Sequence, residues 1–118
     1  MTYMRVRRRI SELEYQWISC LRESLHQNGI PESYYGILEY REEAICLNKA
    51  IDQTWSVYEA ERGNNYNTRK YRDLYSACLD LIDRVSDSVS QRESIIKDFK
   101  RTSASLTNPA VVLDSLRL

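Results

Sequence analysis

The segment that decides the fold class reads Thr54-Trp55-Ser56-Val57-Tyr58-Glu59-Ala60-Glu61. Trp55 and Val57 alternate with more polar side chains, a pattern typical of a strand with one buried face. Residues 34–40 and 43–49 precede it with similar aromatic and β-branched content, and residues 66–71 are a candidate fourth strand. Because the breaks at 41–42 and 50–53 are short, the pattern predicts antiparallel hairpins joined as a meander.

Helical periodicity lies before this segment. Ser11 and Glu14 occupy the two ends of a capping box, in which each side chain accepts the other residue's backbone N–H. Behind the box, apolar residues recur every four positions: Leu13, Trp17, Leu21 and Leu25. Gly29 and Pro31 then end the helix, so the pattern predicts a helix over residues 12–28.

Helical periodicity returns after the strands. Asp73 is the expected N-cap of a helix with an apolar stripe at Leu74, Ala77, Cys78, Leu81, Ile82 and Val85. Ser90 and Glu93 form a second capping box, which predicts that another helix opens there. Asn108 and Pro109 favour a last short helix carrying Val112, Leu113 and Leu116.

The predicted fold class is therefore α+β: an N-terminal helix, a three- to four-stranded antiparallel meander, and two or three C-terminal helices. The simplest packing lays the helices on one face of the sheet. We expect residues 1–11 to be a basic extension, residues 12–101 to form a single domain, and residues 102–118 to be a loop and short helix packed on it.

Composition narrows the class of protein. The 118 residues are 42% hydrophobic and 29% charged, which is typical of a globular domain. Apolar runs stay far shorter than the roughly 20 residues of a membrane span, and no apolar stretch follows the N-terminal arginines as in a secretory signal. The three cysteines, Cys20, Cys46 and Cys78, are odd in number and sit among apolar neighbours. These features predict a cytoplasmic protein with reduced thiols.

The charges are unevenly spread although the formal net charge is zero. Residues 1–10 carry four arginines and no acid, whereas residues 11–61 carry ten acids against three bases, or −7. Residues 62–118 carry ten bases against seven acids, or +3. Such an uneven distribution of charge is a better guide to a protein's binding partners than its total charge. Terminal arginines, here Arg5 to Arg9, are more often a solvated segment than a phosphate site.

The sequence carries no recognisable catalytic or ligand-binding motif. One histidine and three dispersed cysteines cannot supply zinc-site spacing, and no phosphate-binding glycine loop or calcium loop is present. Glu42 and Glu43 would face opposite sides of a strand, which makes them a poor acid–base pair. We therefore expect a binding protein rather than an enzyme, with no catalytic residue, metal, cofactor or small-molecule ligand.

Residues 33–84 resemble small bacterial immunity proteins of polymorphic and contact-dependent growth inhibition toxin systems. The resemblance rests on four segments: Ser33-Tyr34-Tyr35, residues 41–47, Trp55-Ser56-Val57-Tyr58 with Glu61-Arg62-Gly63, and the helix Ala77-Cys78-Leu79-Asp80-Leu81-Ile82. It implies a cytoplasmic antitoxin that binds the C-terminal domain of a cognate toxin, a nuclease above all, and blocks it. Residues 1–11 and 88–118 have no counterpart in the resemblance.

The acidic segment supplies the expected partner-binding residues. A toxin that cleaves nucleic acid needs a basic cleft, which carboxylates can engage by mimicking phosphates. The candidates are Glu39, Tyr40, Glu42, Glu43, Asp52, Tyr58, Glu59 and Glu61. Because side chains alternate along strands and helices must cover one face, about half of these should not face the partner.

Two other functions stay open. A helix, three strands and a helix is also the order of a double-stranded-RNA-binding domain, and Arg69, Lys70 and Arg72 lie near the helix start that contacts phosphates in that family. The zero net charge and the missing Gly-Pro-x-His turn argue against it, so a nucleic-acid partner is not expected. The third function is a chaperone or adaptor subunit of a secretion system.

Overall fold

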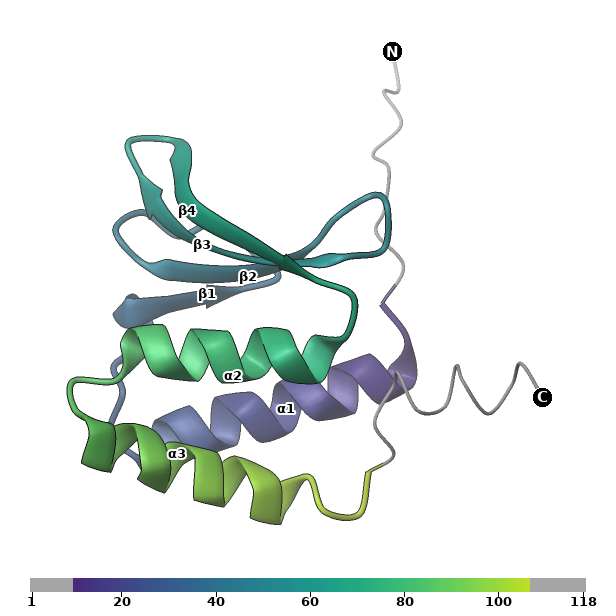
Figure 1. Cartoon of the computed structure of the whole chain (residues 1–118), viewed down its shortest axis with the longest axis vertical. Coiled ribbons are helices and arrows are strands. Elements are labelled where there is room, and N and C mark those ends of the chain that lie inside the picture. The colour runs from purple at the N-terminus through teal and green to yellow at the C-terminus, as the bar shows by residue number, and fades with distance from the viewer. Residues whose placement is uncertain (1–9, 107–118) are drawn as a thin grey trace.

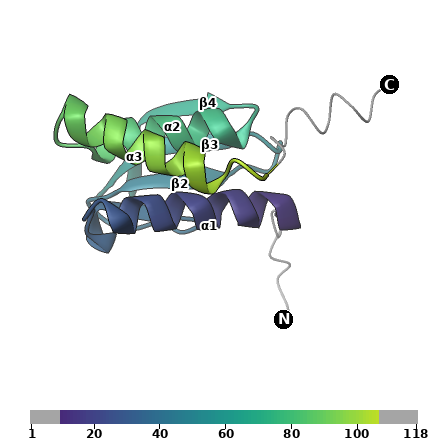
Figure 2. The same ribbon diagram turned by 90° about the horizontal axis from the view of Figure 1, so that it is seen from below.

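The computed structural model describes residues 10–106, which form three layers (Figures 1 and 2). A four-stranded sheet is the first layer, helices α1 and α2 lie against one of its faces, and α3 packs on both helices. The elements run α1 (Glu12–Gln27), η1 (Glu32–Tyr34), β1 (Tyr35–Ile37), β2 (Ile45–Lys49), β3 (Trp55–Glu61), β4 (Asn64–Tyr71), α2 (Leu74–Val85) and α3 (Val89–Thr102). The predicted α+β class is confirmed.

Helix starts follow local side-chain chemistry. Ser11 Oγ accepts from the backbone N of Glu14 at 3.1 Å, and the Glu14 carboxylate accepts from the backbone N of Ser11 at 2.8 Å, as the capping box predicts. Asp73 caps α2 by accepting from the backbone N of Ser76 at 2.8 Å.

The capping box expected at Ser90 is wrong. Helix α3 begins two residues earlier, because Ser88 is extended at φ −153° and its hydroxyl accepts from the backbone N of Gln91 at 3.1 Å. Ser90 is already inside the helix. The short helix expected after Asn108 lies outside the described residues, as do Arg5 to Arg9.

The predicted antiparallel meander is wrong at its first strand. Strands β2, β3 and β4 are antiparallel neighbours, but β1 pairs with β2 in parallel, with Gly36 opposite Cys46. A parallel connection usually needs a dozen residues or more. Here seven suffice, residues 38–44, because β1 is only three residues, or roughly 10 Å, long. We call residues 38–44 the crossover loop.

The hairpin between β3 and β4 confirms the fourth strand. Its turn residues Arg62 and Gly63 both have positive φ, 51° and 77°, as a two-residue turn of the primed type requires. The ladder is irregular between Val57 and Glu59, opposite Asn67, whose φ is 51°. A bulge of this kind bends an edge strand away from further pairing.

The core lies between the sheet and the helices. Leu47, Trp55 and Val57 from the sheet meet the predicted apolar stripes of α1 and α2. Farther from the sheet, the rings of Trp17, Tyr75 and Phe99 join the three helices with centroids 5.6–5.9 Å apart. Such aromatic contacts add to the stabilisation that burial itself provides.

A buried ion pair fixes α1 to the end of β2. The Lys49 ammonium lies 3.0 and 3.1 Å from the two carboxylate oxygens of Glu14, and both residues are more than nine-tenths buried. Lys49 also stands 5.6 Å from the centre of the Trp55 ring. Glu14 therefore serves twice, as the capping-box acceptor and as the counter-ion of a buried lysine.

Candidate functional site

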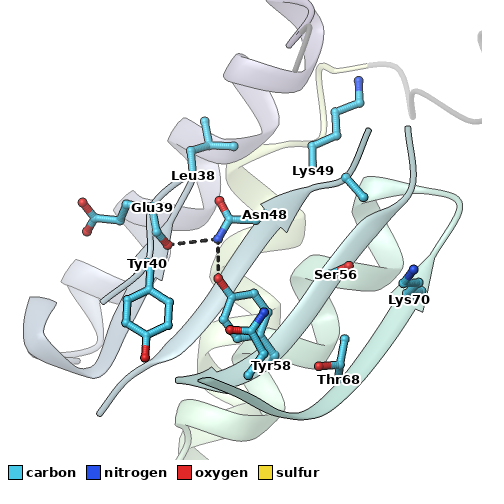
Figure 3. Close-up of a pocket in the computed structure, with 11 residues that line it drawn as sticks. Leu38, Glu39, Tyr40, Asn48, Lys49, Ser56, Tyr58, Thr68 and Lys70 are labelled. Atoms are coloured by element: carbon cyan, nitrogen blue, oxygen red, sulfur yellow. Dashed lines mark hydrogen bonds between the residues drawn. The ribbon is translucent and has the colours of Figure 1, made fainter. Parts of the chain in front are cut away.

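The sheet has one face that the helices leave uncovered, and a polar cleft of about 440 Å³ lies on it (Figure 3). In the register of the strands, Asn48, Ser56 and Lys70 are direct neighbours on β2, β3 and β4. The Ser56 side chain is the smallest of the row, so the surface is hollow there. Leu38, Glu39 and Tyr40 of the crossover loop form the opposite rim. We call this cleft the open-face trough.

Hydrogen bonds at the floor of the trough join the loop to the sheet. The Asn48 side-chain amide donates to the Glu39 carbonyl oxygen at 3.0 Å and to the Tyr58 hydroxyl at 2.9 Å (Figure 3). Tyr58 is only 6% exposed and packs with Cys46 and Ala60. Burial raises the pKa of the Tyr58 hydroxyl, which keeps it protonated at neutral pH.

The crossover loop is held on the open face at several points. Arg41 donates to the Glu32 carbonyl oxygen at 2.8 Å and pairs with Glu39 at 2.9 Å. The Glu42 carboxylate accepts from the backbone N of Arg62 and from the Tyr40 hydroxyl. Glu43 donates its backbone N–H to the Ala60 carbonyl oxygen at 2.8 Å. The loop therefore has one well-defined shape before any partner arrives.

Gly36 lets the loop lie close to the sheet. A Cβ atom at this position would lie 2.9 Å from the Cβ of Arg41 and 3.2 Å from both the Cys46 sulfur and the Glu39 carbonyl oxygen. The Cys46 sulfur in turn accepts from the backbone N of Arg41 at 3.4 Å. Close backbone approach of this kind is a common reason for glycine inside a strand.

Replacing Gly36 by alanine should move the crossover loop. Two of the three close contacts are to a Cβ and a backbone oxygen, which cannot simply rotate away, so we expect a loss of roughly 1–3 kcal/mol in unfolding free energy. Urea denaturation measures it, with Ser56→Ala as a control on the same face. Equal stability of the Gly36→Ala and Ser56→Ala variants would contradict the tight packing.

The structure brings together four of the eight expected partner-binding residues. Glu39, Tyr40, Glu42 and Glu43 all belong to the crossover loop and are exposed. Tyr58 is near them but buried. Asp52 lies in the turn between β2 and β3, where hydrogen bonds from the Thr54 hydroxyl and backbone N–H hold the pKa of its carboxyl below the usual range.

Glu59 and Glu61 share the other face of β3 with Trp55 and Val57. Glu59 accepts from the Asn67 side chain at 2.5 Å and lines a separate cleft of about 380 Å³ beside α2. That cleft also contains Arg69, Asp80, Asp83 and Arg84. Strand alternation thus turns these two side chains to the face opposite Ser56 and Tyr58, whereas the expectation was only that about half of the set would not face the partner.

Sequence reasoning missed Asn48, Ser56 and Lys70. They carry no motif, and Lys70 was considered only as one of three basic residues before a helix. The usable signal was strand alternation: once Leu47, Trp55 and Tyr71 face the core, their neighbours must face away from it.

The cysteines are free thiols with suppressed reactivity. Burial raises the pKa of all three, that of Cys78 most strongly, while Cys20 is only partly buried. A raised pKa means less of the reactive thiolate at any pH below it. We expect an aromatic disulfide reagent at pH 8 to react slowly with Cys20 alone, and with three thiols after unfolding. Fast native reaction of two or more thiols would contradict this.

Metal-binding groups of side chains and membrane-spanning helices are both absent from residues 10–106. No group of three or more His, Cys, Asp and Glu side chains there could hold a metal ion. None of the helices described in this range has the length and apolarity to cross a membrane. Comparisons with family models, with curated proteins and with solved structures gave no significant match to this chain.

Proposed function

We propose that this chain is an immunity protein that binds and neutralises a cognate bacterial toxin domain by blocking its active site. The crossover loop carries the proposal: within five residues it exposes the carboxylates of Glu39, Glu42 and Glu43 and the ring of Tyr40, whose hydroxyl donates to Glu42. An aromatic anchor in an acidic loop suits a basic cleft, such as that of a nuclease. We assign the protein to the cytoplasm, where such a toxin would act.

The charge of the crossover loop and its fixed shape both support a toxin-binding role. Carboxylates steer a positively charged partner and set its orientation, while a tyrosine such as Tyr40, which becomes buried when the partner binds, supplies much of the binding energy. The crossover loop is already hydrogen-bonded to β2, β3 and η1, so little conformational entropy is left to lose on binding. Preorganisation of this kind favours tight, slowly dissociating complexes.

The geometry favours a protein partner over duplex RNA. Lys70 lines the open-face trough, whereas Arg69 lines the cleft beside α2, so the two side chains lie on opposite faces of β4. Glu39 stands on the rim opposite Lys70. A phosphate backbone needs a continuous basic track, and this arrangement does not supply one.

Co-production with a toxin domain tests the proposal. The C-terminal domain of a large exoprotein encoded directly upstream should arrest growth when produced alone and should not when this chain accompanies it. The purified pair should form a stable complex, and the chain alone should not bind duplex RNA at physiological salt. A toxin that still kills, or salt-sensitive RNA binding that needs Arg69, Lys70 and Arg72, would sink the proposal.

A further inference from the structure

Lys70 is the lysine that the open-face trough presents to solvent. Lys70 is exposed, and among residues 10–106 it forms no ion pair within 4 Å. Glu39, on the rim, is paired with Arg41, whereas Asp52 outside the lining accepts from Thr54 and attracts Lys70 only at longer range. The other lysine of the lining, Lys49, is directed to Glu14 on the helix side. Among residues 10–106, one exposed lysine therefore lines the trough without a salt bridge, and only the longer-range attraction of Asp52 acts on its charge.

Hydroxyl donors stand beside this cation. Ser56 is its direct neighbour across the β3–β4 ladder, and opposed Cβ atoms in a sheet are roughly 5 Å apart. Thr68 lines the same cleft from β4, two residues before Lys70. An ammonium with two hydroxyls can surround a small anion, because each group donates one hydrogen bond to it.

The charges around the open-face trough favour a ligand with a single negative charge. Glu39 and Asp52 bring negative charge near the trough, so a phosphate with two charges would meet repulsion that one lysine cannot offset. A carboxylate carries a single charge. The strand spacing of about 4.8 Å puts the backbones of Asn48 and Lys70 roughly 10 Å apart, which is wide enough for one side chain to enter between them.

We propose that the open-face trough receives one carboxylate side chain, Asp or Glu, of the bound partner protein, with Lys70 as its counter-ion and Ser56 and Thr68 as hydrogen-bond donors. This rests on the proposed function. The interface is then divided by charge: the partner is basic opposite the crossover loop and acidic opposite Lys70. An interface that is acidic on one side of the contact area and basic on the other holds the partner in one orientation. It also excludes toxins whose binding surface is uniformly basic.

The chemistry can be tested on the chain alone. ¹⁵N-labelled protein is titrated with sodium acetate and with sodium propionate, the singly charged analogues of the Asp and Glu side chains, at constant ionic strength, against sodium chloride as reference. The expected result is saturating shifts concentrated at the amides of Ser56, Thr68 and Lys70. Lys70→Met should weaken the apparent affinity by about tenfold, the worth of a hydrogen bond to a charged group. Lys97→Met, an exposed lysine of α3, should leave it unchanged.

Each other outcome overturns the proposal. Scattered shifts that both lysine variants retain would mean that the trough does not select carboxylates. Saturation by inorganic phosphate at lower concentration than by acetate would assign the site to a phosphorylated or nucleic-acid ligand instead. Because no toxin is present in the titration, its failure is distinct from a failure to form the toxin complex.

Discussion

Replacing Glu14 by glutamine should lower the free energy of unfolding by roughly 3–5 kcal/mol, which is a large part of what a domain of this size possesses. Glutamine can still accept the Ser11 backbone N–H, so the capping box survives the change. What it cannot do is neutralise Lys49, which is 7% exposed. The cost is therefore that of a buried ammonium that has lost the carboxylate of Glu14. Urea denaturation followed by the fluorescence of the buried Trp17 and Trp55 measures it.

Two further variants separate charge from helix capping. Lys49→Met in the Glu14→Gln background should recover most of the loss, since apolar replacements of buried ion pairs are often neutral or stabilising. Glu12→Gln removes an exposed acid from the same first turn and should stay within about 0.5 kcal/mol of the parent chain. If the double variant is no more stable than Glu14→Gln alone, the buried lysine is not the cause.

The parts of the fold that sequence could predict are those with local causes. The capping box at Ser11, the cap at Asp73 and the turn at Gly63 each depend on residues within three positions of one another. The error at Ser90 shows the limit of such motifs. Ser88 and Ser90 both precede a side chain able to complete a cap, and the backbone of the preceding loop selects Ser88.

The parallel pairing of β1 with β2 could not be predicted from the length of the segment between the two predicted strands. It depends on the contact of Gly36 with Arg41 and Cys46, and on positive φ at Leu38 and Glu43, 61° and 58°. Neither Leu nor Glu favours that conformation, so their sequence gives no sign of it. The ion pair of Glu14 with Lys49 spans 35 positions, and it is equally invisible before the fold is known.

The sequence could suggest only some of the residues of the candidate site, because the others come together only in the folded chain. Residues 39–43 supplied candidates because they are acidic, but the sequence assigned them to two strands and not to one loop. Alternation predicted that about half of the eight candidates would face elsewhere, without saying which. The open-face trough beside the loop needs the register of three strands, which places Asn48, Ser56 and Lys70 in one row. Register is set by packing of the opposite face and is not written in the trough residues themselves.

Truncating Tyr40 to alanine should weaken toxin binding by about 2–4 kcal/mol, or roughly 30- to 1,000-fold in Kd, while leaving the fold intact. Its ring is 42% exposed at the crossover loop and its hydroxyl bonds to the exposed Glu42 and to the Gly63 backbone, so little folding energy depends on it. Glu43→Lys should also weaken binding, mainly through a slower association that depends on salt.

Matched controls decide whether the crossover loop is the interface. Tyr15 of α1 and Tyr66 of β4 are 50% and 46% exposed, much like Tyr40, but they lie on other elements. Tyr15→Ala, Tyr66→Ala and Glu93→Lys on α3 should leave Kd within about threefold, because isolated exposed side chains contribute little. Calorimetric titration of each variant against the toxin domain gives the comparison. If Tyr15→Ala on the helix side costs more than Tyr40→Ala, the partner binds the helices, and the acidic crossover loop is only a solvated surface.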